Sequence, residues 1–178
     1  MAAAITKGDC AIKGAFKEHL AAVLDKLSDC GVKVEDVDGG LRVRPRKSLK
    51  PVNITTLPYP CFPTDMQAQM MSLMSVTPGV SVFTEKIYPD RFMHVAELNR
   101  MGANIMREGP HAIIEGKKSL SGAPVMASDL RASAALVLAG LVAKGRTEIS
   151  RIYHLDRGYE NMELKLQKLG ARVWRERE

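Results

Sequence analysis

Two aspartates stand at corresponding places in the chain, each at the start of a long apolar stretch. Asp65 follows Thr64 and precedes a stretch rich in Met and Leu, whereas Asp129 follows Ser128 and precedes a stretch rich in Ala and Leu. A carboxylate can take up or give up a proton during a reaction. In an isolated sequence, an aspartate in the first turn of a helix is more often explained by its favourable interaction with the helix dipole. The duplication makes both residues candidates for chemistry.

Each of these aspartates is followed by an Asp-Arg pair at nearly the same distance. Asp90 comes 25 positions after Asp65, and Asp156 comes 27 positions after Asp129. The pairs end the similar runs KIYPDR and RIYHLDR. An arginine can donate two parallel hydrogen bonds to a phosphate or a carboxylate, although a lone Asp-Arg pair is more often a surface ion pair of little energetic value. The repeated spacing predicts two copies of one arrangement of acid and guanidinium groups.

Capping residues predict that the two aspartates lie at helix starts. Thr64 and Gln67 fit a capping box for a helix over 65–76. Ser128 is a good N-cap for a second helix, whose apolar stretch reaches Ala143. We therefore expect each carboxylate in the first turn of a largely buried helix.

A second pattern divides the chain into units. One motif occurs three times: a leucine, a glycine four positions later, and then a stretch in which apolar and polar residues alternate. The three glycines lie 71 and 68 positions apart, which indicates structural repeats. We expect a single α/β domain over 1–178 built of βαβαββ units: a partial unit over about 1–50, a unit over 51–116 and a unit over 117–178. Strands are expected over 32–34 and 41–44 as a hairpin, and over 52–56, 80–84, 104–107, 112–115, 147–152 and 171–174; other helices are expected over 17–29, 93–101 and 159–169. The first copy lacks a helix and the last ends early, so we expect the chain to be part of something longer.

Composition limits the function classes. Of the 178 residues 46% are hydrophobic and 26% charged, as in an ordinary soluble domain. The longest nearly apolar run, 132–143, is shorter than the roughly 20 residues that span a bilayer, and the start has no signal-peptide pattern. Cys10, Cys30 and Cys61 have no metal-ligand spacing, so reduced thiols in a cytoplasmic protein are the simplest account.

The positive charge allows an anionic partner. A net charge of +6 suits a nucleic acid, a phosphorylated metabolite or no specific partner. The densest basic run is Arg42–Lys50, and its alternating charges are typical of a solvated hairpin or an edge strand blunted by Pro45. No aromatic residue lies among these charges, which disfavours the binding of single-stranded nucleic acid by base stacking.

Four stretches taken together resemble one enzyme family. They are PTDMQ at 63–67, DRFMH at 90–94, LSGAPVMASDLR at 120–131 and IYHLDRGYE at 152–160. In this order and spacing they resemble the bacterial UDP-N-acetylglucosamine enolpyruvyl transferases (1-carboxyvinyltransferases), and the resemblance covers essentially the whole chain. It implies two similar domains, each an inside-out α/β barrel of three βαβαββ units with helices in the core and sheets outside. This chain resembles only the domain formed mostly by the C-terminal half.

The resemblance also implies an activity. The enolpyruvyl group of phosphoenolpyruvate passes to the 3′-hydroxyl of UDP-N-acetylglucosamine and phosphate leaves, which is the first committed step of cytoplasmic peptidoglycan precursor synthesis. The implied partners are these two substrates and the N-terminal domain of the same enzyme, with no cofactor, metal, nucleic acid or membrane. That domain carries the reactive cysteine loop of most members, and none of the three cysteines here matches it. The isolated chain is therefore expected to be inactive.

Residue roles follow from the resemblance at the positions that match. The implied catalytic residues are Asp65, beside the sugar hydroxyl as the general base, and Asp129, which assists proton transfer. The implied contacts to UDP-N-acetylglucosamine are Thr64, Asp65, Ile87, Tyr88, Arg91 and Leu130, and the implied contacts to phosphoenolpyruvate or phosphate are Arg131 and Arg157. His94 and His154 match no catalytic position, so structural roles are expected for them.

Two alternative functions stay open. The first is an enolpyruvyl transferase that acts on shikimate 3-phosphate with the same architecture, although the run YHLDRGYE favours the sugar-nucleotide branch. The second is a non-catalytic, basic βαβαββ module that binds RNA or another protein, similar to modules of RNA 3′-phosphate cyclases and of a translation initiation factor. Binding to RNA that weakens steeply with salt would favour this second alternative.

Overall fold

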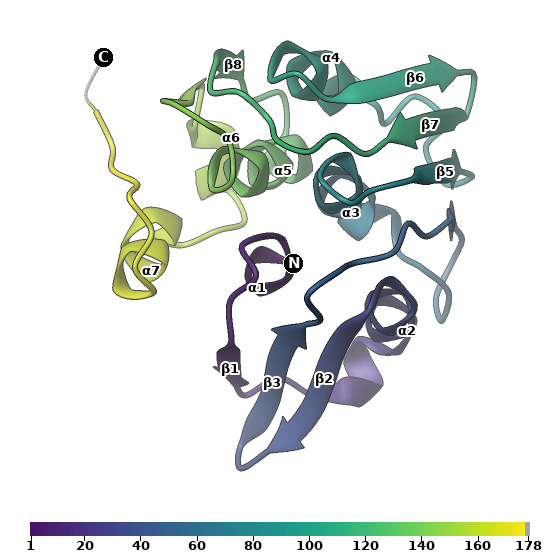
Figure 1. The fold of residues 1–178 in the computed structure, drawn as a ribbon, viewed down its shortest axis with the longest axis vertical. Coiled ribbons are helices and arrows are strands. Elements are labelled where there is room, and N and C mark those ends of the chain that lie inside the picture. The colour runs from purple at the N-terminus through teal and green to yellow at the C-terminus, as the bar shows by residue number, and fades with distance from the viewer. Residues whose placement is uncertain (177–178) are drawn as a thin grey trace.

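The computed structural model describes residues 1–176 and has the α/β fold that the sequence predicts (Figure 1). The first elements are α1 (Ala2–Ile5), β1 (Cys10–Lys13), a 3-10 turn (Lys17–His19), α2 (Ala21–Cys30), β2 (Val32–Val37) and β3 (Gly40–Pro45). Their strands form an antiparallel sheet in the order β1-β3-β2. The predicted hairpin is confirmed, since Val37 pairs with Gly40. Gly31 follows α2 with a φ of 97°, a left-handed conformation that glycine adopts without strain.

The first part of the basic run, up to Pro45, lies in the middle strand of this sheet, so the predicted hairpin is confirmed for it and the alternative of an edge strand is wrong. β3 pairs with β2 on one side, and the short strand β1 covers its other side. Arg42 and Arg44 both contact Asp9, with Nε–Oδ distances of 2.7 and 3.3 Å. The charges therefore lie on a solvated strand beside a carboxylate.

The second group of elements has the full βαβαββ order. It comprises β4 (Ile54–Thr56), a 3-10 turn (Thr64–Met66), α3 (Gln67–Ser75), β5 (Val80–Glu85), α4 (Met93–Arg100), β6 (Asn104–Glu108) and β7 (His111–Glu115). The sheet order is β4-β5-β7-β6, with β4 parallel to β5 and the other pairs antiparallel. The parallel pair requires a crossover, and α3 lies within it.

The third group repeats the parallel pair around a helix. It comprises β8 (Pro124–Met126), α5 (Leu130–Gly140), β9 (Glu148–Ser150), α6 (Tyr153–Asp156) and α7 (Met162–Lys168), with β8 parallel to β9. The strand expected over 171–174 is absent from the described residues, and the Arg175 that follows it forms ion pairs with Asp156 and Glu163. The helix expected over 159–169 is shortened to α7, and the strand expected over 147–152 is shortened to β9.

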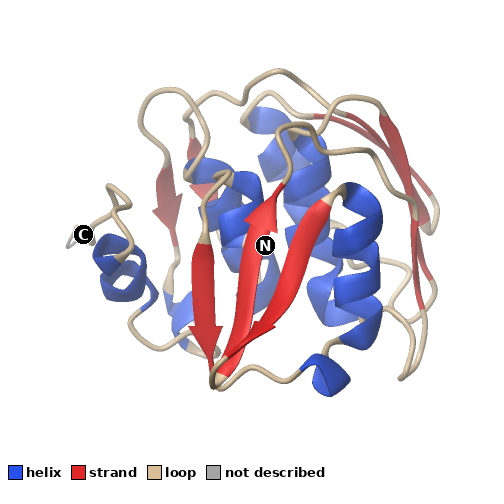
Figure 2. Ribbon diagram, turned by 60° about the horizontal axis from the view of Figure 1, so that its bottom comes forward, coloured by secondary structure: helices blue, strands red, loops and turns tan. Residues whose placement is uncertain are grey.

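The core is formed by two helices enclosed by sheets. All nine residues of α3 are buried, as are most of α5, so these helices lack the polar face of a surface helix. Ser72 Oγ donates a hydrogen bond to the carbonyl oxygen of Ala135 at 2.8 Å, which joins α3 to α5 directly. Figure 2 shows helices in the interior and strands around them. None of the helices described within residues 1–176 is long and apolar enough to span a bilayer.

The start and end of α5 differ from the prediction by a few residues. Asp129 rather than Ser128 is the N-cap, because Asp129 has the extended backbone and its Oδ1 accepts hydrogen bonds from the amides of Arg131 and Ala132. The helix ends at Gly140 instead of near Ala143. The chain turns away there, and the Lys144 amide donates to the carbonyl of Leu120.

Candidate functional site

The two predicted helix starts meet at Arg131. Its backbone amide donates to Asp129 Oδ1 at 2.6 Å, and its side-chain Nε donates to Asp65 Oδ1, also at 2.6 Å. One residue therefore connects the carboxylate before α5 with the carboxylate before α3. The two helix starts therefore lie next to each other in the fold, with one arginine between their carboxylates.

Asp65 lies in the 3-10 turn that leads into α3, and its carboxylate faces solvent. Its side chain is 62% exposed. A second guanidinium reaches the same oxygen, since Arg91 Nη1 lies 3.3 Å from Asp65 Oδ1. An exposed carboxylate held by two cations is accessible to a ligand and has a defined orientation.

Arg91 also contacts Thr64 and Tyr88. Its Nη1 donates to Thr64 Oγ1 at 2.8 Å, and its guanidinium lies over the Tyr88 ring at 4.2 Å from the centroid. The cation–π distance is within the range of an attractive contact. Thr64, Asp65 and Tyr88, which the family resemblance assigns to one ligand together with Arg91, therefore all lie near Arg91.

The predicted capping box between Thr64 and Gln67 is wrong. The Thr64 hydroxyl donates instead to Glu85 Oε2 at 2.8 Å, and Gln67 Nε2 donates to the carbonyl of Arg91 at 3.3 Å. The helix begins as a 3-10 turn without a side-chain cap. Both side chains are taken up by contacts with residues more than twenty positions away.

Glu85 is a residue of this site that the sequence analysis missed. It is the last residue of β5 and is fully buried, with hydrogen bonds to Thr56, Thr64 and the amides of Ile87 and Tyr88. The alternation of β5 buries Ser81 and then Phe83, and the same period places Glu85 inside. This alternation of buried positions was the sequence feature that could have revealed Glu85.

The segment around Arg157 packs against the first turn of α5. A Cβ atom at Gly158 would lie 3.3 Å from Leu130 Cδ1, so the two residues are in close contact. Tyr159 reaches α3, where Gln69 Nε2 donates to its hydroxyl at 3.3 Å. Arg157 itself is exposed, and its side chain makes no hydrogen bond or ion pair within the described part of the chain. All the predicted site residues thus come from segments that meet at the N-terminal ends of α3 and α5.

His94 lies beside this site but is not exposed to it. Its side chain is buried, and Nε2 lies 3.1 Å from Met71 Sδ. Burial lowers the pKa of His94 from 6.5 to about 4, against the opposing effect of the nearby Asp129 charge. A neutral, buried imidazole fits the structural role expected for it.

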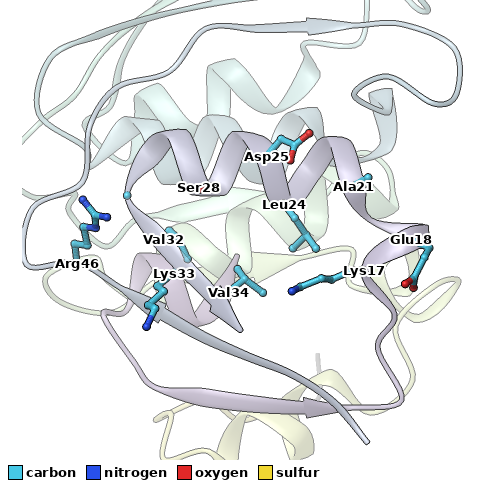
Figure 3. Close-up of a pocket in the computed structure, with 11 residues that line it drawn as sticks. Lys17, Glu18, Ala21, Leu24, Asp25, Ser28, Val32, Lys33, Val34 and Arg46 are labelled. Atoms are coloured by element: carbon cyan, nitrogen blue, oxygen red, sulfur yellow. The ribbon is translucent and has the colours of Figure 1, made fainter. Parts of the chain in front are cut away.

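A cavity of about 450 Å³ lies elsewhere, between α2 and β2 (Figure 3). None of the residues that line it belongs to the predicted site. Its cations include Lys17, which contacts Asp36, and Lys33, which contacts Glu35. Within residues 1–176, no cluster of three His, Cys, Asp or Glu side chains is suited to a metal ion.

Comparison with known sequences gives a consistent result. The sequence model of the family described as EPSP synthase (3-phosphoshikimate 1-carboxyvinyltransferase) matches residues 1–166. UDP-N-acetylglucosamine 1-carboxyvinyltransferase 1 of Caldanaerobacter subterraneus is 57% identical over 98% of this chain and 42% of its own length. UDP-N-acetylglucosamine 1-carboxyvinyltransferase of Myxococcus xanthus is 55% identical over 99% of this chain and 42% of its own length. The chain therefore spans about two fifths of the length of these curated relatives.

Solved structures agree with this grouping. The enolpyruvyl transferase NikO from Streptomyces tendae matches 96% of this chain and 41% of its own, with a TM-score of 0.86 and 28% identity. EPSP synthase from Acinetobacter baumannii matches 97% of this chain and 41% of its own, with a TM-score of 0.70 and 21% identity, which supports the fold alone.

Proposed function

The chain belongs to the EPSP synthase family, and from this premise we propose that it forms part of a UDP-N-acetylglucosamine 1-carboxyvinyltransferase. In the proposed reaction the enolpyruvyl group of phosphoenolpyruvate moves to the 3′-hydroxyl of UDP-N-acetylglucosamine and phosphate is released. The product would enter peptidoglycan precursor synthesis in the cytoplasm. The observation that carries the proposal is the contact of Arg131 with both Asp65 and Asp129.

Asp65 is the proposed general base for the sugar hydroxyl. Its carboxylate is open to solvent, so a bound substrate can reach it. Arg91 and Arg131 hold this group from two sides and restrict its orientation. A general base must lie within hydrogen-bond distance of the proton that it removes, and a fixed orientation favours that geometry.

Arg131 and Arg157 are the proposed contacts for the anionic groups of phosphoenolpyruvate. Arg131 uses its Nε for Asp65, and within residues 1–176 neither of its Nη atoms has a hydrogen-bond partner. A guanidinium group has five N–H donors in one plane, so Arg131 can keep its contact with Asp65 while it binds an anion. Arg157 is exposed on the adjoining segment and supplies a second cation.

Asp129 is proposed to assist proton transfer while the sugar hydroxyl adds to phosphoenolpyruvate. Its Oδ1 is occupied by two backbone amides, which fix the carboxylate next to the start of α5. Thr64, Ile87, Tyr88, Arg91 and Leu130 are proposed to border the nucleotide sugar. No cofactor takes part in the proposed reaction.

The proposal extends to a second domain, because the matched relatives are more than twice as long as this chain. We propose that this N-terminal domain closes over the substrates and supplies the remaining catalytic groups. Closure would exclude water from a site that is open here, which strengthens the electrostatic contacts to both substrates.

A hybrid enzyme tests the proposed function. In it, residues 1–178 replace the matching segment of the Caldanaerobacter subterraneus relative. With phosphoenolpyruvate as donor, we expect phosphate release with UDP-N-acetylglucosamine and none with shikimate 3-phosphate as acceptor. The opposite acceptor preference would replace the proposal by the shikimate alternative, and activity with neither acceptor would reject both.

The variant Asp65→Asn tests the general base in the same hybrid. We expect kcat to fall by about 10²–10⁴-fold, because the amide cannot accept the proton. The unfolding temperature should change little, since the side chain is exposed. Asp90→Asn is a matched control, because Asp90 is 97% exposed and pairs only with Arg107 within residues 1–176. Near-normal turnover by Asp65→Asn would remove Asp65 from the mechanism.

A further inference from the structure

Glu85 is the only fully buried carboxylate among residues 1–176. It ends β5, lies just before the Ile87–Tyr88 turn and contacts Thr64. A carboxylate is costly to bury unless hydrogen bonds compensate for its lost hydration. The hydrogen bonds that Glu85 accepts therefore show which neighbouring groups it holds in place.

Four donors surround the Glu85 carboxylate. Oε1 accepts from Thr56 Oγ1 at 2.6 Å and from the amides of Ile87 and Tyr88 at 2.9 and 3.0 Å. Oε2 accepts from Thr64 Oγ1 at 2.8 Å. Oε1 therefore accepts three hydrogen bonds and Oε2 accepts one, so both oxygens of the carboxylate have partners. Three of the donors belong to residues proposed to border the nucleotide sugar, and these residues come from two separate segments.

The contact also fixes the direction of the Thr64 hydroxyl group. Thr64 gives its single proton to Glu85, and it must therefore accept the hydrogen bond from Arg91 Nη1. Arginine has no acceptor, so these roles cannot be exchanged. The free lone pair of Thr64 Oγ1 can only accept, and a ligand at this point must offer a hydroxyl or an amide N–H.

We infer that Glu85 is a positioning residue for the nucleotide-sugar side of the proposed site. It holds the Ile87–Tyr88 turn against Thr64 and sets the hydroxyl direction that Thr64 presents to the ligand. The inference rests on the proposed function. It assigns Glu85 no part in proton transfer, because its carboxylate is buried behind Thr64 and all its contacts are within the protein.

The variant Glu85→Gln in the hybrid enzyme tests this role. Gln has the same shape, but its amide presents a donor to groups that themselves donate. We expect the KM for UDP-N-acetylglucosamine to rise about tenfold or more, since charge-assisted hydrogen bonds that orient the ligand contacts are lost. The kcat at saturation and the KM for phosphoenolpyruvate should stay within about threefold of the unaltered hybrid.

Two further variants complete the experiment. Glu108→Gln, at the exposed end of β6, is the matched control and should leave both KM values unchanged. If Glu85→Gln does not fold, Glu85→Asp keeps the charge but is one methylene too short to reach both Thr64 and the two amides, and it should raise the same KM.

The outcomes separate the inference from the proposed function. An unaltered hybrid that neither binds the nucleotide sugar nor releases phosphate would overturn the proposed function. An active hybrid in which the Glu85 variant lowers the unfolding temperature while the KM for the nucleotide sugar stays unchanged would overturn the inference, because a purely structural residue gives that result. A loss confined to kcat would overturn it as well.

Discussion

Arg131 has two roles that depend on different parts of the residue. Its backbone amide is one of the free N–H groups at the start of α5 and donates to the side chain of the N-cap Asp129. Such an N-cap contributes about 1 kcal/mol to stability. Its side chain pairs with the exposed Asp65, and surface ion pairs contribute little to stability. The value of the second contact therefore lies in orientation, since it aligns a carboxylate from one segment with the helix start of another.

His94 makes the stability of the chain depend on pH. Its folded-state pKa of about 4 lies below the ordinary 6.5, so the unfolded state takes up a proton first as the pH falls. The stability that depends on a neutral His94 is therefore fully present above pH 6.5, and it is lost as the pH falls from 6.5 to 4. We expect a loss of about 2 kcal/mol between pH 7 and pH 5 from this group.

Urea unfolding at pH 7 and pH 5 measures this loss. The wild type and His19→Gln, a change at an exposed position, should both show it. His94→Leu should be less sensitive to pH by about the same 2 kcal/mol, whatever its stability at pH 7. An equal pH dependence in His94→Leu and the wild type would contradict the depressed pKa.

At the scale of the elements, the parts with local causes could be predicted from the sequence. The end of α2 at Gly31 follows from one glycine, and the hairpin between β2 and β3 follows from alternation around Asp38-Gly39. The N-cap of α5 was misplaced by one residue, because Ser128 and Asp129 are both good caps and only the backbone conformation decides between them.

The parts with long-range causes could not be predicted. Thr64 and Gln67 have the types of a capping box, but their partners are Glu85 and Arg91, which the sequence does not place beside them. The contact between Asp65 and Arg131 is also long-range, and the duplicated helix starts indicated two similar arrangements without placing them side by side. The remaining assignments to substrates came from the family resemblance.

The segment after α7 is held by charge rather than by a sheet. Arg175 Nη1 donates to Asp156 Oδ2 at 2.9 Å, and Nη2 lies 3.0 Å from Glu163 Oε2. The hydrogen bond from Arg175 lowers the pKa of Asp156 below its usual 3.8. The contact is therefore complete at neutral pH and is lost as the pH falls through the lowered pKa of Asp156.

Trp174, the only tryptophan, reports on this contact. Its fluorescence should be constant from pH 7 to pH 5 and change only below about pH 4. Arg175→Gln should show the altered emission already at pH 7, because the ion pairs with Asp156 and Glu163 are then absent at all pH values. Arg172→Gln, a neighbouring change outside these ion pairs, should behave like the wild type. Unaltered emission from Arg175→Gln at pH 7 would show that other contacts hold the segment.

At the scale of the molecule, two buried helices bring their N-terminal ends to one place while the sheets form the outside. The charged groups gathered there are open to water: Asp65 is 62% exposed, and Arg157 is exposed as well. Hydration weakens every charge contact at such a site. This exposure is the reason for proposing that a second surface covers the site during the proposed reaction.

Complementation tests this proposal directly. The chain alone should release no phosphate from the two substrates, because its site stays hydrated and lacks the groups of the second domain. Mixing it with the separately produced remainder of the Caldanaerobacter subterraneus relative should restore phosphate release that saturates with the concentration of either part. The chain with Asp65→Asn should bind the remainder equally well and restore nothing. Turnover by the chain alone would show that the open site suffices, and a mixture that associates but stays inactive would show that this half does not supply the catalytic carboxylate.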